Sequence, residues 1–247
     1  MYAIIGGSGL AKLSALDRPR RMVMRTPYGE PSGALTFGHL AGHEVVFLAR
    51  HGYGHTIAPH DINYRANIWV LKDLKVEGVV AVATVGSIRE DIGPGTLVLP
   101  HQIIDYTYSR KATFFEGPDV PVTHVDFTHP YTERLRADLL RAARTCNEQL
   151  IDGAVYACTQ GPRLETAAEI ERIARDGGEI VGMTGMPEAG LAREAGLDYA
   201  TLGVVVNHAA GRGTSRKQIK LDQLEAVMRA TVVRAVRILE ALLAGVQ

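Results

Sequence analysis

Residues 79–84 read VVAVAT, and all but the last are apolar. An apolar run of this length, without alternating polar residues, is typical of a strand buried on both faces of a sheet. A second run of this kind, TLGVVV, occupies residues 201–206. Two such strands predict a sheet that is covered by helices on both sides.

Further apolar runs alternate with helical patterns along the chain. We expect strands at residues 2–5, 44–49, 78–84, 96–99, 154–158 and 199–206. We expect helices at residues 63–76, 132–146, 165–175, 187–194 and 222–244. Strands that alternate with helices predict an α/β fold with a mixed central β-sheet flanked by helices. The chain has 247 residues and no internal repeat, so we expect a single domain over residues 1–247.

The composition is that of a soluble globular protein. The 27 basic and 27 acidic side chains give a formal net charge of +0, which argues against nucleic acid or an anionic membrane as a partner. The opening MYAIIGGSGL lacks the basic region of a signal peptide, and no apolar run approaches the roughly 20 residues of a membrane helix. Cys146 and Cys158 are too few for a disulfide framework. We therefore expect reduced thiols and a cytoplasmic protein.

Polar residues follow several of the expected strands, at the ends where ligands bind in α/β folds. The first strand runs into GGSGL, where glycines and Ser8 favour either an anion-binding turn or an ordinary tight turn. Arg50 and His51 follow the second strand. A guanidinium suits an oxyanion such as phosphate, and we expect His51 to add a donor next to it. Gly86 opens the turn after VVAVAT, and Thr184 stands in VGMTGMPEAG. These loops together predict a phosphate-type site.

The loop after the second strand has two other interpretations. Arg50 can be a surface residue that stands beside a structural histidine. Alternatively, His51, His55 and His60 can be metal ligands, although a dedicated site usually adds Cys or carboxylate ligands at short spacing.

Two further polar residues suit the edge of a flat heterocycle. Glu165 follows the Gly-Pro turn in CTQGPRLETAAEIE, where it can cap the next helix or point at a ligand. Asn207 ends the strand that contains TLGVVV, and its amide offers both a donor and an acceptor unless it only shapes a turn. Met183 adds an apolar surface, although Met is more often a core residue.

The motifs IIGGSGL, LARHGYGH, NYRANIWVLK, TVGSIREDIGPG, YACTQGPRLETAAE and VGMTGMPEA occur in this order. In these motifs and their spacing the chain resembles, over nearly its whole length, the trimeric purine nucleoside phosphorylases and methylthioadenosine phosphorylases. The resemblance implies the nucleoside phosphorylase fold, a homotrimer and a pentosyltransferase of purine salvage. Such enzymes convert a nucleoside and phosphate into a free purine and a sugar 1-phosphate. Inorganic phosphate is then a co-substrate, and no cofactor or metal is implied.

The resemblance also assigns roles to residues of this chain. Phosphate binding falls to Ser8, Arg50, His51, Thr184 and the backbone at Thr84. Met183 and Leu164 fall in the substrate site, with Met183 under the sugar. Glu165 and Asn207 fall on base-recognition positions. Asn207 and His51 are the implied catalytic residues, because Asn207 can bond the purine where negative charge accumulates and His51 stands at the attacking phosphate.

The pair of Glu165 and Asn207 accompanies 6-oxopurine bases in the family. An ionised carboxylate only accepts hydrogen bonds, and a 6-oxopurine donates from N1 whereas adenine does not. Methylthioadenosine phosphorylases instead have a small hydroxyl residue and an Asp at these positions. Ile219 stands where enzymes for ordinary ribosides have a His that holds the 5′-hydroxyl, and an apolar residue suits a methylthio group. His124 is implied in the 5′ pocket of a neighbouring subunit.

The combination of pockets resembles the bacterial S-methyl-5′-thioinosine phosphorylases. The expected reaction is phosphorolysis of methylthioinosine to hypoxanthine and 5-methylthioribose 1-phosphate. The alternatives are a purine nucleoside phosphorylase for inosine and guanosine, a methylthioadenosine phosphorylase, a histidine-metal hydrolase, and a nucleotide-binding protein without turnover.

Overall fold

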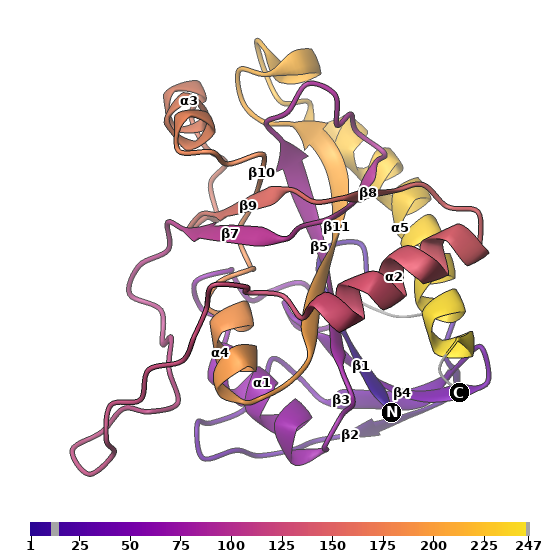
Figure 1. The fold of residues 1–247 in the computed structure, drawn as a ribbon, viewed down its shortest axis with the longest axis vertical. Helices are drawn as coiled ribbons and strands as arrows, with labels where there is room; N and C mark the ends of the chain where they lie inside the picture. The colour runs from indigo at the N-terminus through magenta and orange to yellow at the C-terminus, as the bar shows by residue number, and fades with distance from the viewer. Residues whose placement is uncertain (11–14, 246–247) are drawn as a thin grey trace.

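The chain forms one mixed sheet of 11 strands with helices on both faces, in a computed structural model that describes residues 1–10 and 15–245 (Figure 1). The strands are β1 (Tyr2–Gly6), β2 (Asp17–Met22), β3 (Leu35–Leu40), β4 (His43–Ala49), β5 (Val79–Ser87), β6 (Leu97–Leu99), β7 (Gln102–Asp105), β8 (Leu150–Asp152), β9 (Val155–Cys158), β10 (Ile180–Gly182) and β11 (Tyr199–His208). The helices are α1 (Tyr64–Asp73), α2 (Glu133–Thr145), α3 (Ala167–Arg175), α4 (Glu188–Glu194), α5 (Leu221–Ala244) and the 3₁₀ turn η1 (Gly213–Ser215).

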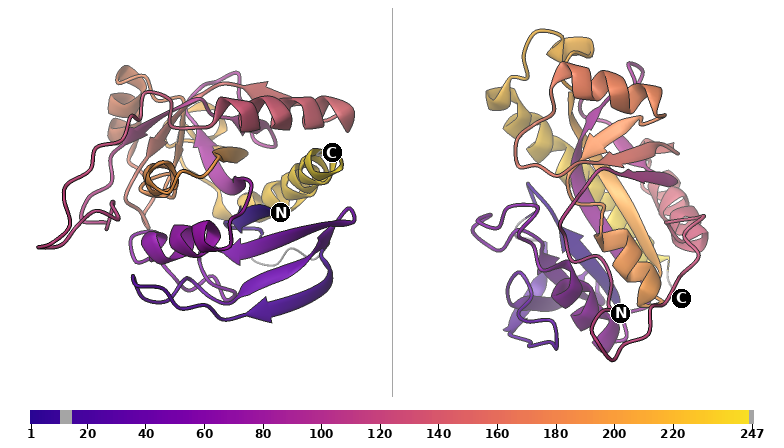
Figure 2. Two further views of the ribbon diagram at one scale, coloured as in Figure 1. Left: turned by 60° about the horizontal axis from the view of Figure 1, so that its bottom comes forward. Right: turned by 90° about the vertical axis from the view of Figure 1, so that its left-hand side faces the viewer.

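The apolar stretch at residues 79–84 lies in β5, at the centre of the sheet. One edge of β5 pairs in parallel with β11 over its whole length. The other edge pairs in parallel with β1 over its first half and antiparallel with β10 near its end. Beyond this edge the sheet continues through β1 to β2 and through β10 to β7, and these two ends lie far apart (Figure 2).

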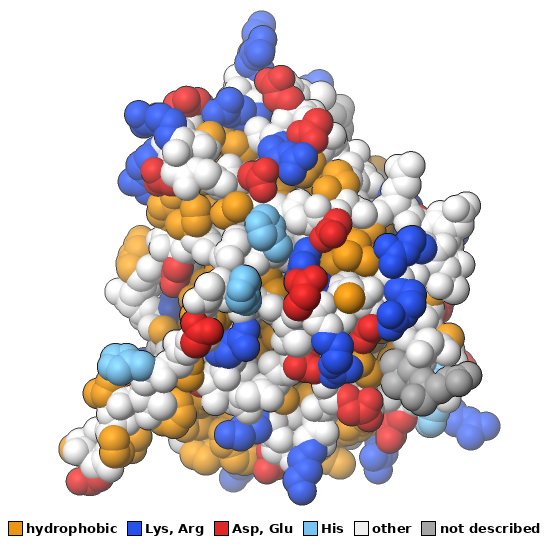
Figure 3. Space-filling model, in the orientation of Figure 1, with side chains coloured by type: hydrophobic (Ala, Val, Ile, Leu, Met, Phe, Trp, Pro, Cys, Tyr) orange, Lys and Arg blue, Asp and Glu red, His pale blue; other side chains and the backbone are white. Residues whose placement is uncertain are grey.

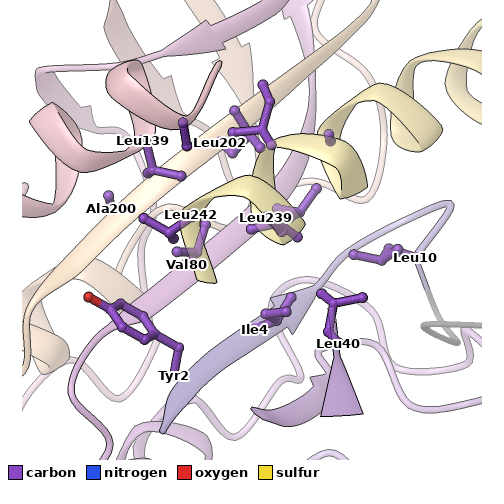
Figure 4. Packing of buried hydrophobic residues seen from close by; sticks show 14 of the residues in the cluster. Tyr2, Ile4, Leu10, Leu40, Val80, Leu139, Ala200, Leu202, Leu239 and Leu242 are labelled. Carbon is purple, nitrogen blue, oxygen red and sulfur yellow. The ribbon is translucent and has the colours of Figure 1, made fainter. Parts of the chain in front are cut away.

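Successive residues of the central strands enter two different cores, because side chains alternate between the faces of a sheet. Ile4 and Val80 pack with α2 and α5 in one core (Figure 4). Ile5 and Ala81 pack with α1 and α4 in the other. The double coverage explains why VVAVAT carries no polar alternation, as the sequence predicted. The expected α/β fold with a mixed sheet is therefore confirmed.

Every strand and helix expected from the sequence is present, with ends that shift by up to a few residues. The unexpected strands are β2, β3, β7, β8 and β10. β2 reads DRPRRM, is exposed throughout and pairs only with β3 at the sheet edge. β8 and β10 have only 3 residues each, so no periodicity can reveal them. β8 and β10 are set by pairing with the distant strands β6 and β5.

The surface has mixed charge on the face that Figure 3 shows, where acidic and basic side chains are interspersed. A long segment between β7 and α2 projects from the body of the molecule (Figure 1), and Val120, Val122 and Val125 are exposed on it. Among the described residues, no helix is both long and apolar enough to cross a membrane.

Candidate functional site

A gap in strand pairing forms the floor of a cavity. β1 ends with Gly6 opposite Val82 of β5. β10 meets the same edge of β5 from the opposite direction, with Val181 opposite Gly86. In the part of the chain that the structure describes, no strand pairs with this edge at residues 83–85, and a cavity of about 480 Å³ opens there. Backbone groups of β5 are thus available beside the ends of β1, β4 and β10.

The predicted site residues gather at this cavity. The residues that line it include Ser8, Arg50, His51, Thr84, Leu164, Glu165, Met183, Thr184, Asn207 and Ile219. His124 does not line it and is exposed on the projecting segment. The cavity contains the acidic, amide, hydroxyl and apolar groups of the prediction, but their individual roles stay predictions.

Arg50 is buried rather than at the surface, with 1% of its side chain exposed. Its Nε and Nη2 donate to the two oxygens of Glu188 at 2.7 and 2.9 Å. Its Nη1 donates to the Val82 carbonyl at 3.2 Å. Although burial opposes the charge, the Glu188 carboxylate raises the pKa of Arg50 above its ordinary value. Three of the five N–H groups of the Arg50 guanidinium therefore bond to the protein itself, and two remain for an oxyanion such as phosphate.

Glu188 was not singled out by the sequence, yet it organises this side of the cavity. It is fully buried. Tyr199 donates its hydroxyl to Glu188 Oε1 at 2.8 Å, in addition to the two bonds from Arg50. A buried carboxylate needs such partners. The position of Arg50 thus depends on a residue 138 positions away in the chain.

His51 is a neutral imidazole with a defined tautomer. Its Nδ1 lies 2.9 Å from the carbonyl oxygen of Ile57, which only accepts, so Nδ1 is the donor. Burial and the Arg50 guanidinium lower the pKa of His51 to about 4. At neutral pH its Nε2 is therefore an acceptor, whereas the sequence predicted a donor to phosphate. The physical reason is that Ile57 takes the only N–H of the neutral ring.

The three-histidine metal site does not form. The rings of His51 and His55 are tilted by 44° with 4.6 Å between centroids, and His55 Nε2 lies 3.4 Å from Ser8 Oγ. The His60 side chain is more than a third exposed, and its Nε2 lies 3.6 Å from Asp61 Oδ2. Over residues 1–10 and 15–245, no group of three or more His, Cys, Asp or Glu side chains could hold a metal ion.

Glu165 is not a helix cap. The predicted helix from residue 165 begins at Ala167, and Thr166 is its N-cap in a capping box with Glu169. Glu165 precedes this box, is half-buried and lines the cavity. Its Oε1 accepts a hydrogen bond from Thr159 Oγ1 at 2.6 Å. Glu165 therefore does not cap α3. Of the two alternatives from the sequence, this favours a side chain that points at a ligand.

Asn207 and Met183 owe their positions to irregular backbone. The register of β11 against β5 shifts between Val205 and Asn207, and such a bulge redirects a side chain. Asn207 Nδ2 donates to the His208 carbonyl at 2.6 Å, which leaves Oδ1 and a second N–H. The Met183 thioether packs on Gly161, where φ is +62° and a Cβ would lie 2.4 Å from the sulfur. Only glycine fits there.

Arg110 and Thr159 are functional candidates that the sequence did not indicate. Arg110 follows β7 and donates from Nη1 to the Met183 carbonyl and from Nη2 to the Gln160 carbonyl, each at 2.9 Å. It thus joins the two loops that carry Met183 and Glu165. Nothing in the local sequence SRKA distinguishes Arg110 from a surface cation.

Three comparisons place these features among known proteins. The family model of the Phosphorylase superfamily matches residues 1–244. A protein of Pseudomonas syringae pv. tomato, named a probable S-methyl-5′-thioinosine phosphorylase, is 52% identical over 229 residues, 93% of this chain and 92% of that protein. The 6-oxopurine nucleoside phosphorylase of Pyrococcus furiosus is 49% identical over 214 residues, 85% of this chain and 80% of that protein.

Solved structures agree with the sequence comparisons. The methylthioadenosine phosphorylase of Schistosoma mansoni, solved in complex with adenine, matches with a TM-score of 0.92 and 33% identity over 98% of this chain and 90% of that one. The mixed sheet with its cavity is thus the fold of nucleoside phosphorylases. The chain belongs to the phosphorylase superfamily.

Proposed function

We propose that the protein catalyses phosphorolysis of S-methyl-5′-thioinosine to hypoxanthine and 5-methylthioribose 1-phosphate. The observation that carries this proposal is the Glu165 carboxylate, which lines a cavity with apolar residues elsewhere on its wall. Among the described residues, no Lys or Arg forms an ion pair with it. The same cavity thus offers an acceptor for an oxopurine and an apolar surface for a thioether.

The base end of the cavity favours a 6-oxopurine. Glu165 accepts hydrogen bonds and suits the N1–H of hypoxanthine, whereas the bare N1 of adenine would meet it lone pair to lone pair. Asn207 has a second N–H that can donate to O6 or N7, both of which are acceptors in the nucleoside. Negative charge accumulates on the purine as it leaves, so a donor from Asn207 stabilises the transition state more than the ground state.

The sugar end of the cavity favours a methylthio group. Ile219 and Leu224 line the cavity where the loop after η1 enters α5, and Leu164 adds a further apolar side chain. A 5′-hydroxyl there would lose hydrogen bonds to water without gaining a partner from these side chains. A thioether loses much less, so these residues support 5′-methylthio substrates over ordinary ribosides.

The phosphate end needs no protein nucleophile. Phosphate attacks the anomeric carbon while the purine leaves, and positive charge develops on the sugar between two anionic groups. Ser8, Thr184 and the backbone at residues 83–85 line the cavity as donors, and Arg50 contributes its remaining N–H groups. His51 Nε2 suits the proton of a monoprotonated phosphate. Burial raises the pKa of Cys158 to about 12, so this thiol is not a nucleophile.

The proposal is tested by phosphorolysis of methylthioinosine, inosine and methylthioadenosine side by side, each with and without phosphate. We expect phosphate-dependent turnover with the highest kcat/KM for methylthioinosine. A higher kcat/KM for inosine would overturn the role of Ile219 and leave the base argument intact. A higher value for methylthioadenosine would overturn the role of Glu165. Turnover without phosphate would contradict the mechanism, as would a loss of turnover when a chelator is added. No turnover of any of the three nucleosides would favour a binding protein.

The second candidate is a purine nucleoside phosphorylase for inosine and guanosine. The similarity to the Pyrococcus furiosus 6-oxopurine enzyme favours it, because both substrate classes carry the same base edge. The apolar 5′ wall argues against it.

We further propose a cytoplasmic homotrimer that requires no cofactor or metal. The family resemblance supports the trimer, and the exposed valines of the projecting segment offer an apolar contact surface for a second copy. His124 lies on this segment, which suits a role in a neighbouring subunit. The free cysteines Cys146 and Cys158 support a reducing compartment.

A further inference from the structure

The hydroxyl of Thr159 is directed at Glu165. Thr159 Oγ1 lies 2.6 Å from Glu165 Oε1 and 3.3 Å from the carbonyl oxygen of Gly182. A hydroxyl has one proton to donate, and the Gly182 carbonyl already accepts the backbone N–H of Thr159 at 2.8 Å. The shorter bond to an ionised acceptor is the stronger one. The Thr159 hydroxyl therefore donates its proton to the Glu165 carboxylate.

Thr159 is itself held by the backbone, without any contribution from a ligand. It follows β9 directly, and its N–H bonds to the end of β10 at Gly182. Its carbonyl accepts from Arg110 Nη2 at 3.3 Å. The donor is thus fixed in space before substrate binds, as a preorganised site requires.

The cation nearest in sequence to Glu165 is engaged elsewhere. Arg163 donates to both oxygens of Glu169, at 2.8 and 2.7 Å. Glu169 in turn belongs to the capping box of α3. Glu165 is therefore oriented by a neutral hydroxyl, which leaves its negative charge available. A carboxylate rotates through a broad torsional minimum when nothing holds it.

We infer that Thr159 is a positioning residue that determines base specificity, because it holds Oε1 of Glu165 and leaves Oε2 to accept from N1–H of a 6-oxopurine. This inference rests on the proposed function. Without the hydroxyl, the carboxylate can turn away from the purine, so binding of an oxopurine weakens while binding of an adenine nucleoside does not.

The test compares Thr159→Val, which keeps the shape and removes the hydroxyl, with Thr159→Ser, which keeps the hydroxyl. We expect Thr159→Val to lower kcat/KM for methylthioinosine by about tenfold, as loss of a hydrogen bond to a charged group predicts. The loss should be mainly in KM for the nucleoside. KM for phosphate and kcat/KM for methylthioadenosine should stay unchanged, and Thr159→Ser should restore selectivity.

Thr145→Val is the matched control, because the Thr145 hydroxyl also donates a hydrogen bond, to the Arg141 carbonyl, but Thr145 lies in α2 outside the cavity. Thr159→Ala repeats the test with a smaller side chain should Thr159→Val not fold. Unchanged selectivity in folded Thr159→Val or Thr159→Ala would overturn the inference, as would an equal loss for both nucleosides with a raised KM for phosphate. If the wild-type protein does not turn over methylthioinosine, the proposed function fails first and separately.

Discussion

Arg50 and Glu188 form a fully buried ion pair beside the cavity, and each depends on the other for its solvation. We expect Arg50→Ala to lower the free energy of unfolding by about 3–5 kcal/mol, because it leaves the Glu188 carboxylate buried without a cation. The double variant Arg50→Met with Glu188→Leu should lose much less, since it removes both charges. Urea unfolding of the three proteins measures this. A double variant no more stable than Arg50→Ala would contradict the pairing.

His51 makes stability depend on pH because its pKa is lowered to about 4 by burial and by Arg50. The unfolded imidazole binds a proton near pH 6.5, so between about pH 6.5 and 4 the unfolded state holds more protons. The contribution of His51 to stability is therefore complete above this window and is lost as the pH falls through it.

His51→Asn should flatten the pH dependence of unfolding over the same window, since the amide keeps a donor for Ile57 and cannot titrate. Urea unfolding at several pH values measures the difference between the variant and the wild type. Parallel curves for the two proteins would show that His51 is not held neutral.

At the scale of elements, helix α3 and the Glu165 carboxylate are neighbours, and we expect them to have separate tasks. Thr166→Ala removes the N-cap hydroxyl of α3 and should lower the free energy of unfolding by about 1 kcal/mol. Glu165→Gln should change stability by less than about 0.5 kcal/mol and instead reduce kcat/KM for methylthioinosine. Thermal unfolding and steady-state kinetics on both variants test whether Thr166 contributes to stability and Glu165 to activity. A larger stability loss in Glu165→Gln than in Thr166→Ala would restore Glu165 as the cap.

The sequence was informative about elements that bury an apolar face and about residues that follow them. β5 and β11 are apolar runs, and the groups of the cavity stand at strand ends, so both could be predicted. The gap at residues 83–85 could not, because it results from the register of β1 and β10 on one edge of β5. The ion pair between Arg50 and Glu188 could not be predicted either, because the two residues are 138 positions apart and meet only in the tertiary fold.

At the scale of the whole molecule, the projecting segment between β7 and α2 is the expected contact between subunits. Val122 is 77% exposed there, and Val23 is equally exposed just after β2. A charge in an apolar interface is costly, so we expect Val122→Asp to lower the mass in solution below three chains. Val23→Asp is the matched control and should leave it unchanged. Light scattering after gel filtration reports the mass, and a wild-type monomer would contradict the trimer.

We propose that Glu165 and Asn207 together select an oxopurine base in a phosphate-dependent reaction. The most direct measurement is kcat/KM for methylthioinosine and methylthioadenosine in the wild type and in the double variant Glu165→Ser with Asn207→Asp. The wild type should favour methylthioinosine strongly, because a site built around a hydrogen bond rejects an analogue that lacks the donor. The double variant should shift its preference toward methylthioadenosine. A double variant that still selects methylthioinosine would contradict the claim.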